Sequence, residues 1–228
     1  MIHRFRDRAE AGQRLAELLA EYADRPDVLI LALPRGGVPV AFEVAQALHA
    51  PLDVLVVRKL GVPDQEELAM GAIAAGGVRV LNDDVVHELH IPRDVIERVA
   101  ASEHAELERR ERVYHGGRIA PVLRDQTVIL VDDGLATGTT VCAAIAAVRA
   151  QRPAQIIVAI PVAAAESLAA LRPLVDALVW VIAPEPFDAL GLWYENFVPT
   201  TDGEVCALLE CGARAPGSTG DRQQAPLP

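Results

Sequence analysis

Two adjacent carboxylates, Asp132 and Asp133, end an apolar run and begin a segment rich in glycine and threonine, VILVDDGLATGTT (128–140). The glycines allow the backbone to turn tightly and approach a ligand, and the threonine hydroxyls supply hydrogen-bond donors. A helix predicted to begin near residue 139 would turn its free N–H groups toward the same segment. Such a loop is typical of an anion site, with phosphate as the usual occupant.

The two carboxylates need a different partner, because like charges repel a phosphate. Carboxylates accept hydrogen bonds from paired sugar hydroxyls and can hold Mg²⁺ through its waters. The segment has no lysine and no GxxxxGK[ST] or GxGxxG spacing, which excludes the common nucleotide loops. A phosphate at one end and a diol beside it together indicate a ribose 5-phosphate.

The segment 128–140 resembles the phosphoribosyl-diphosphate (PRPP) signature of the type I phosphoribosyltransferases over all thirteen positions. The resemblance implies that Asp132 and Asp133 bind the ribose 2- and 3-hydroxyls, serve catalysis and hold Mg²⁺ through water or ligand. It also implies a site for the 5-phosphate on Ala136, Thr137, Gly138, Thr139 and Thr140. Hypoxanthine-guanine members carry an acid where this chain has Ala136. That difference argues against their subclass and leaves the proton acceptor open.

A second loop, LPRGGVPVA (33–41), resembles the pyrophosphate loop of that family. Gly36 and Gly37 would expose backbone N–H groups to an anion, and Arg35 would add a positive charge. In the family, the preceding strand lies beside the strand that carries the PRPP loop, so both loops would face one cleft. Taken alone, PRGG favours a simple turn from a strand into a helix, and the PRPP loop beside it favours the functional interpretation.

Arg58 and Lys59 directly follow a second predicted strand, 52–57. Several family members have a basic residue here that touches the pyrophosphate, so we assign Lys59 a catalytic role and Arg58 a substrate-binding one. A surface salt bridge is the alternative. The next segment, 60–77, resembles the mobile loop that closes over the site in the family. Closure would exclude water from the reacting sugar.

Two further segments have open interpretations. Arginines and glutamates alternate along a predicted helix at 106–118, which indicates either a solvent-exposed charged face or an arginine that reaches the PRPP phosphates. Beyond the last strand, residues 183–197 contain four aromatic residues within eleven positions, including Trp193. Trp193 could stack on a nucleobase, or the aromatic residues could close the sheet edge as part of the core.

Composition limits the classes of partner. The chain has 228 residues, with 32 acidic and 21 basic side chains and a net charge of −11, which disfavours binding to nucleic acid or membrane. No run reaches the roughly 18 apolar residues of a membrane span, and the charged start lacks the apolar stretch of a signal peptide. Three cysteines without CxxC spacing predict buried, free thiols in a reducing cytoplasm. The histidines have no zinc spacing.

Apolar runs of strand length alternate with helical patterns along most of the chain, which predicts an α/β fold. We expect a three-layer sandwich with a mostly parallel sheet of five or six strands. Residues 1–211 would form a single domain, with a helical and hairpin insert at about 60–126, including a hairpin at 69–81. The insert would form a flexible loop or hood, and a second hood segment would lie at about 183–200. The polar stretch 212–228 would be a disordered tail.

We therefore expect a phosphoribosyltransferase that joins the 5-phosphoribosyl group of PRPP to a nitrogen acceptor, such as a nucleobase, with Mg²⁺ as cofactor and pyrophosphate as product. Many relatives are homodimers, so we expect a homodimer. One alternative is a regulatory protein of the same fold that binds PRPP or a nucleotide and transfers nothing. Another is a different transferase or a hydrolase acting on a ribosyl or phosphate ester.

Overall fold

The computed structural model describes residues 4–116 and 120–213. Its main sheet has five strands in the order β2-β1-β6-β7-β8, and all neighbouring strands are parallel. The strands are β1 (Val28–Ala32), β2 (Leu52–Val54), β6 (Thr127–Val131), β7 (Gln155–Val162) and β8 (Ala177–Ile182). Every residue of β1 and β6 is buried, as expected for parallel strands covered on both faces.

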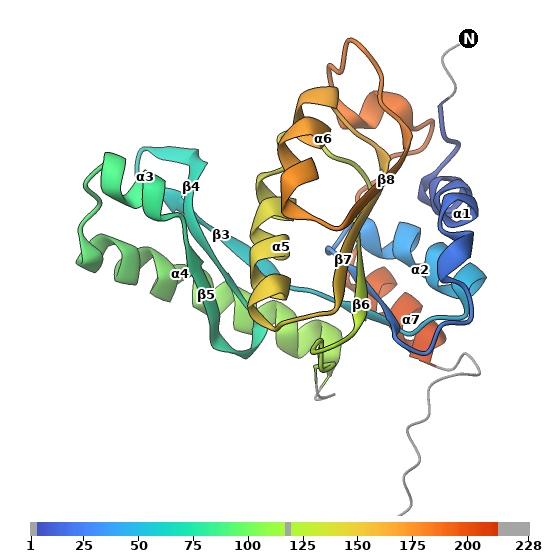
Figure 1. Cartoon of the computed structure of the whole chain (residues 1–228), viewed down its shortest axis with the longest axis horizontal. Coiled ribbons are helices and arrows are strands. Elements are labelled where there is room, and N and C mark those ends of the chain that lie inside the picture. Colours follow the sequence, from blue (N-terminus) through green and yellow to red (C-terminus); the bar gives the residue numbers. More distant parts are fainter. Residues whose placement is uncertain (1–3, 117–119, 214–228) are drawn as a thin grey trace, which may run out of the picture.

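Helices cover the two faces of this sheet and make the three layers that the sequence predicts (Figure 1). One face carries α1 (Arg8–Leu18), α2 (Gly37–Leu48) and α7 (Asp202–Ala213), and the other carries α5 (Thr139–Ala150) and α6 (Ala165–Leu171). Alternate residues of β1 divide between these layers. Ile30 packs with the first group of helices, and Leu31 packs with the second.

The insert forms a second sheet of three antiparallel strands beside the main one (Figure 1). It contains β3 (Val57–Val62), β4 (Gln65–Ala74), β5 (Val78–Leu81), α3 (Asp83–Glu88) and α4 (Arg93–His115). Helix α4 contacts β3 and β4, and α5 of the core contacts all three strands. The insert sheet therefore lies between α4 and the helix that begins at the glycine- and threonine-rich loop. The hairpin predicted at 69–81 is confirmed as β4 and β5.

One predicted strand has the wrong bounds. Residues 52–57 do not form a single strand, because β2 stops where its neighbour β1 ends, with Val54 opposite Ala32. Val57 already pairs with Ala74 in the insert sheet. Most of the segment 60–77 lies in the strands β3 and β4. Its closure over the site remains a prediction.

The C-terminal boundary also differs from the prediction. Helix α7 continues to Ala213, so the polar tail begins no earlier than residue 214, and residues 214–228 lie outside the described part of the chain. The arginine-rich helix ends at His115, which leaves Arg118 outside the described residues as well. No helix in the described ranges is long and apolar enough to cross a membrane.

Candidate active site

The glycine- and threonine-rich loop joins β6 to α5 and is fixed at its centre by Leu135. The Leu135 amide donates to the carbonyl of Val162 at 2.9 Å, and the Leu135 side chain is buried. Gly138 precedes the helix with φ of 76°, a left-handed conformation that glycine adopts without steric cost. Thr137 and Thr140 remain exposed. The first N–H groups of α5 lack helical partners and face this loop, which makes an anion cradle.

The loop 34–37 lies directly against the acid pair, as predicted. A Cβ atom at Gly37 would stand 2.9 Å from the Cα of Asp132, and one at Gly36 would stand 2.0 Å from Oδ2 of Asp133. Only glycine allows this approach. Because β1 and β6 are neighbours, the two loops that follow them meet at one edge of the sheet.

The two acids share a buried environment that disfavours their charged forms. Burial and the neighbouring Asp133 charge raise the pKa of Asp132 well above its usual range. Burial also raises the pKa of Asp133, although the guanidinium of Arg8 acts against this shift. The backbone amide of Asp133 donates to Oδ1 of Asp132 at 2.9 Å, which orients that carboxylate. Binding of hydroxyl donors or a cation would stabilise the charged forms of such a pair.

Sequence reasoning missed Arg8, whose Nε donates to Oδ2 of Asp133 at 2.8 Å. It also missed the hydroxyl of Tyr194, which donates to the Asp133 carbonyl at 2.6 Å. Arg8 lies 125 residues before Asp133, and no periodic or motif signal connects the two. Tyr194 belongs to the aromatic cluster that the sequence singles out, although its contact with the acid pair was not foreseen.

Arg35 is directed toward the N-terminus of α7. One of its terminal nitrogens lies 3.8 Å from Oδ1 of Asp202, and a terminal nitrogen of Arg109 lies 3.8 Å from Oδ2 of the same carboxylate. Tyr114 donates a hydrogen bond to Asp202 at 2.7 Å. The arginine-rich helix α4 therefore brings Arg109 close to the loop 34–37. On the same helix Arg109 also pairs with Glu106 at 2.7 Å, as a charged helix face would.

Arg58 and Lys59 point to opposite faces of β3. Arg58 forms an ion pair with Glu103 of α4 at 2.6 Å, and its substrate-binding role stays a prediction. Lys59 pairs with Ala72 across the hairpin, so both side chains lie on the face that α5 covers. A role for Lys59 at the diphosphate remains a prediction.

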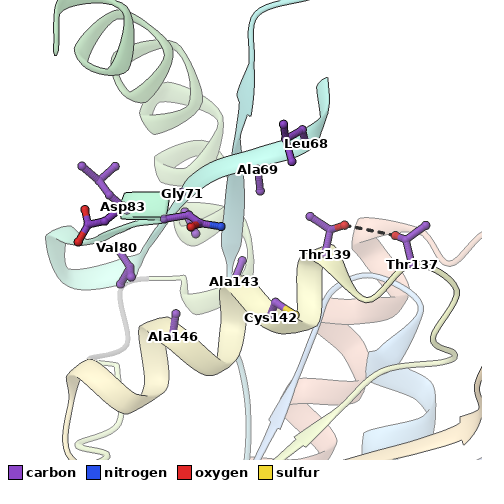
Figure 2. A pocket seen from close by; sticks show the side chains of 13 residues that line it. Leu68, Ala69, Gly71, Val80, Asp83, Thr137, Thr139, Cys142, Ala143 and Ala146 are labelled. Atoms are coloured by element: carbon purple, nitrogen blue, oxygen red, sulfur yellow. Dashed lines mark hydrogen bonds between the residues drawn. The ribbon is translucent and has the colours of Figure 1, made fainter. Parts of the chain in front are cut away.

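A cavity of about 510 Å³ opens on that face, between the insert sheet and α5 (Figure 2). Leu68 and Ala69 lie above it, while Thr137 and Thr139 stand at the end nearest the loop, with their hydroxyl oxygens 3.4 Å apart. Cys142 follows on the first turn of α5 (Figure 2). The cavity is lined by Leu68, Ala69, Gly71, Ala72, Val80, Leu81, Asn82, Asp83, Thr137, Thr139, Cys142, Ala143 and Ala146. A ligand in the anion cradle would thus have an apolar space beside it.

Trp193 is 8% exposed and packs in an apolar cluster with Phe5, Ala11, Val162 and Tyr194. This position favours the interpretation that the ring completes the core at the sheet edge over the prediction that it stacks on a nucleobase. All three cysteines are free, as expected, but the expected burial is wrong, because Cys142 and Cys206 are half-buried and Cys211 is exposed.

The described residues contain no cluster of three or more metal-binding side chains. A magnesium ion at this site would therefore depend on Asp132, Asp133, waters and ligand oxygens. Mg²⁺ commonly binds in this way, through one or two carboxylates together with substrate phosphates. The donor set fits the predicted cofactor without forming a complete cage.

The sheet order, the acid pair and the two glycine-lined loops define an α/β protein whose site lies at the carboxyl ends of parallel strands. The family model for the phosphoribosyl transferase domain matches residues 1–185. The chain belongs to this family.

Known proteins agree with this assignment. The chain is 46% identical over 206 residues to a provisionally named phosphoribosyl transferase of Mycobacterium tuberculosis, from strains CDC 1551 and H37Rv. The match covers 90% of this chain and 46% of the relative, so the chain spans about half the length of these curated relatives.

Solved structures agree on the fold. The crystal structure of TT1426 from Thermus thermophilus is 39% identical, with a TM-score of 0.84 over 90% of this chain and 97% of that one. AQ2163 from Aquifex aeolicus is 13% identical, with a TM-score of 0.50. The match covers 81% of this chain and 78% of that one, and it shows similarity of fold alone. The fold is that of the type I phosphoribosyltransferases.

Proposed function

We propose that this protein transfers the 5-phosphoribosyl group of PRPP to a nitrogen acceptor and releases pyrophosphate. The observation that carries the proposal is the contact between the two loops. The Gly36–Gly37 turn lies against Asp132 and Asp133, and α5 begins at Thr139, six residues beyond Asp133. In this proposal each loop binds an anion at one edge of the sheet, with the pair of carboxylates between them. PRPP carries a phosphate, a diol and a diphosphate in a corresponding order.

In the proposed reaction the nitrogen lone pair forms a bond to C1 of the ribose. The bond from C1 to the diphosphate oxygen breaks, and pyrophosphate leaves with the electron pair. The proton released from the nitrogen can pass to the departing diphosphate. The chain's own contribution is to position the sugar and to hold developing charge. Asp132 and Asp133 would bind the diol, and residues 136–140 the 5-phosphate.

The diphosphate would lie on the N–H groups of the loop 34–37, with Arg35 and Lys59 as the nearby cations. Mg²⁺, when bound, would supply positive charge to the leaving group. Asp132 and Asp133 are the residues that would hold it, together with ligand oxygens. The acceptor, a nucleobase in our proposal, would approach C1 from the side opposite the diphosphate.

The test is release of pyrophosphate from PRPP with Mg²⁺, measured across adenine, guanine, hypoxanthine, xanthine, uracil, orotate and nicotinate. We expect release with one acceptor class, and loss of release in the double variant Asp132→Asn, Asp133→Asn. PRPP binding without release in the presence of any acceptor would favour the regulatory alternative. An absence of PRPP binding would reject the proposal.

A further inference from the structure

Arg8, the first residue of α1, reaches the acid pair from outside the two loops. Its Nε lies 2.8 Å from Oδ2 of Asp133, and the two side chains are only 11% and 12% exposed. A second guanidinium nitrogen donates to the Val198 carbonyl at 2.8 Å. The guanidinium carbon lies 4.0 Å from the centre of the Phe197 ring, a distance typical of a cation–π contact. Arg8 is thus held on several sides while it contacts the acid.

The segment around Arg8 is bonded to the chain beyond β8. The Phe5 amide donates to the Trp193 carbonyl at 2.8 Å, and the Glu195 amide donates to the Phe5 carbonyl at 2.8 Å. The Asn196 amide donates to the Arg6 carbonyl at 2.9 Å. Residues 5–8 and 193–198 therefore form one hydrogen-bonded unit, which we call the terminal clamp.

The terminal clamp holds Asp133 at two points. Arg8 binds its carboxylate, and the Tyr194 hydroxyl donates to its backbone carbonyl at 2.6 Å. Gly36 also packs against this carboxylate, with no room for a Cβ atom. The rotation of the Asp133 side chain is therefore restricted by groups from two distant parts of the chain. Asp132 is held differently, with the Asp133 amide donating to its carboxylate.

We propose that Arg8 is a positioning residue for PRPP binding and that the terminal clamp is part of the site. Arg8 binds Oδ2 of Asp133, fixes the orientation of this carboxylate and leaves Oδ1 for the ribose diol beside Asp132. This inference rests on the proposed function. It adds that the N-terminal helix and the segment beyond β8 set the geometry of the acid pair. A guanidinium suits this role because it donates in two directions while its flat face packs on an aromatic ring.

The first experiment measures the Kd of PRPP with Mg²⁺ by titration calorimetry, together with thermal unfolding, for wild type, Arg8→Ala, Arg8→Lys and Arg98→Ala. Arg98 is the matched control, because it lies on α4 outside the terminal clamp, its side chain is 72% exposed and it pairs with Asp94. We expect Arg8→Ala to weaken binding about 10- to 100-fold, the usual effect of removing a group that orients a ligand-binding residue. Arg8→Lys should recover part of the loss, and Arg98→Ala should match wild type.

A double-mutant cycle separates positioning from general stability. In an Asp133→Asn background, Arg8→Ala should cause little further loss of PRPP affinity, because the carboxylate that it orients is gone. A folded Arg8→Ala variant whose Kd lies within twofold of wild type would overturn the inference. If Arg8→Ala does not fold, a Kd of Arg8→Lys within twofold of wild type would overturn the inference instead.

Failure of the proposed function is distinguishable, because wild type itself would then not bind PRPP. In that case a crystal structure of ligand-free Arg8→Lys tests whether Arg8 positions the Asp133 carboxylate. An Asp133 carboxylate turned away from its wild-type orientation supports the positioning role. An unchanged orientation refutes it.

Discussion

Gly36 lies so close to Asp133 that a Cβ atom at position 36 would stand 2.0 Å from the carboxylate oxygen Oδ2. The two residues follow different strands, β1 and β6, which pair along their whole length. The same oxygen accepts the hydrogen bond from Arg8, so it cannot move away from position 36 without breaking a buried ion pair. A single added carbon therefore affects the glycine loop, the acid and the terminal clamp together.

We accordingly predict that Gly36→Ala lowers the midpoint of thermal unfolding and weakens PRPP binding at least about tenfold, since tight overlap in a packed region costs about 1–3 kcal/mol. Calorimetric titration with PRPP provides the measurement. Gly203→Ala is the matched control, because the nearest atom to its Cβ would be Thr201 Oγ1 at 4.0 Å. Equal PRPP affinity in the two variants would show that the loop 34–37 does not form part of the PRPP site.

The two acids should respond differently to removal of their charge. Burial and the charge of Asp133 raise the pKa of Asp132, so its ionised form destabilises the fold at neutral pH. Asp132→Asn keeps an oxygen for the Asp133 amide, and we expect its unfolding midpoint to rise. Asp133→Asn leaves the buried Arg8 without a counter-ion, which costs about 3 kcal/mol or more, and its midpoint should fall.

Both single variants should lose most of their PRPP affinity, and the double variant should bind none. Thermal unfolding of the two single variants at pH 7 tests the difference in stability, and calorimetry tests the affinity. A midpoint for Asp132→Asn that falls as far as that of Asp133→Asn would refute the distinct roles of the acids. Undiminished PRPP affinity in the double variant would refute the assignment of the ribose site.

The alkylation rate of Cys142 can be used to detect a ligand in the anion cradle. It lies on the first turn of α5 and lines the cavity that begins at Thr137 and Thr139 (Figure 2). We predict that PRPP slows its alkylation by iodoacetamide severalfold, because a ligand in the cradle covers this end of the cavity. Burial raises the pKa of the Cys142 thiol, so alkylation should be followed at about pH 9, where more thiolate is present.

A variant with Cys206→Ser and Cys211→Ser leaves Cys142 as the single thiol and makes the rate unambiguous. Inorganic phosphate at high concentration should protect Cys142 less than PRPP does, because it fills only the cradle. If saturating PRPP leaves the alkylation rate unchanged, the 5-phosphate does not lie at the N-terminus of α5.

The contact between the acid pair and the loop 34–37 is predictable from the sequence, and the reason is local. Asp132 directly follows an apolar strand, and a parallel sheet places its strand ends at one edge, so the acid pair and the loop 34–37 had to be neighbours once β1 and β6 paired. The insert was harder to predict. Its strand β4 contains small residues and a glycine, Gly71, which are typical of loops. Burial against α4 and α5 stabilises them as strands.

Arg8 could not be found from the sequence, because its partner lies 125 residues away and charged side chains near a helix start are common. The pairing of residues 5–6 with residues 193–196 helps to bring it to the acid. Trp193 shows a different limit. Four aromatic residues close together suit a stacking face or a core equally well, and burial of the ring in this fold supports the core.

The last prediction concerns a buried group outside the site. Burial raises the pKa of Glu111 on α4, although the nearby His115 opposes the shift. Its Oε1 is buried and accepts no hydrogen bond from the described residues, and it lies 3.6 Å from the His115 ring. A carboxyl group with a raised pKa in the folded state contributes most to stability below its unfolded pKa, near 4.5. It loses that contribution as pH rises through its folded pKa.

Glu111→Gln should therefore be more stable than wild type at pH 7, and the difference should shrink as the pH is lowered toward 4.5. Urea unfolding at several pH values between 4.5 and 8 measures this difference. Glu108→Gln serves as control, because Glu108 lies on the exposed side of the same helix, and it should show no comparable trend. A stability difference for Glu111→Gln that is constant with pH would mean that Glu111 has the same pKa in the folded and unfolded chain.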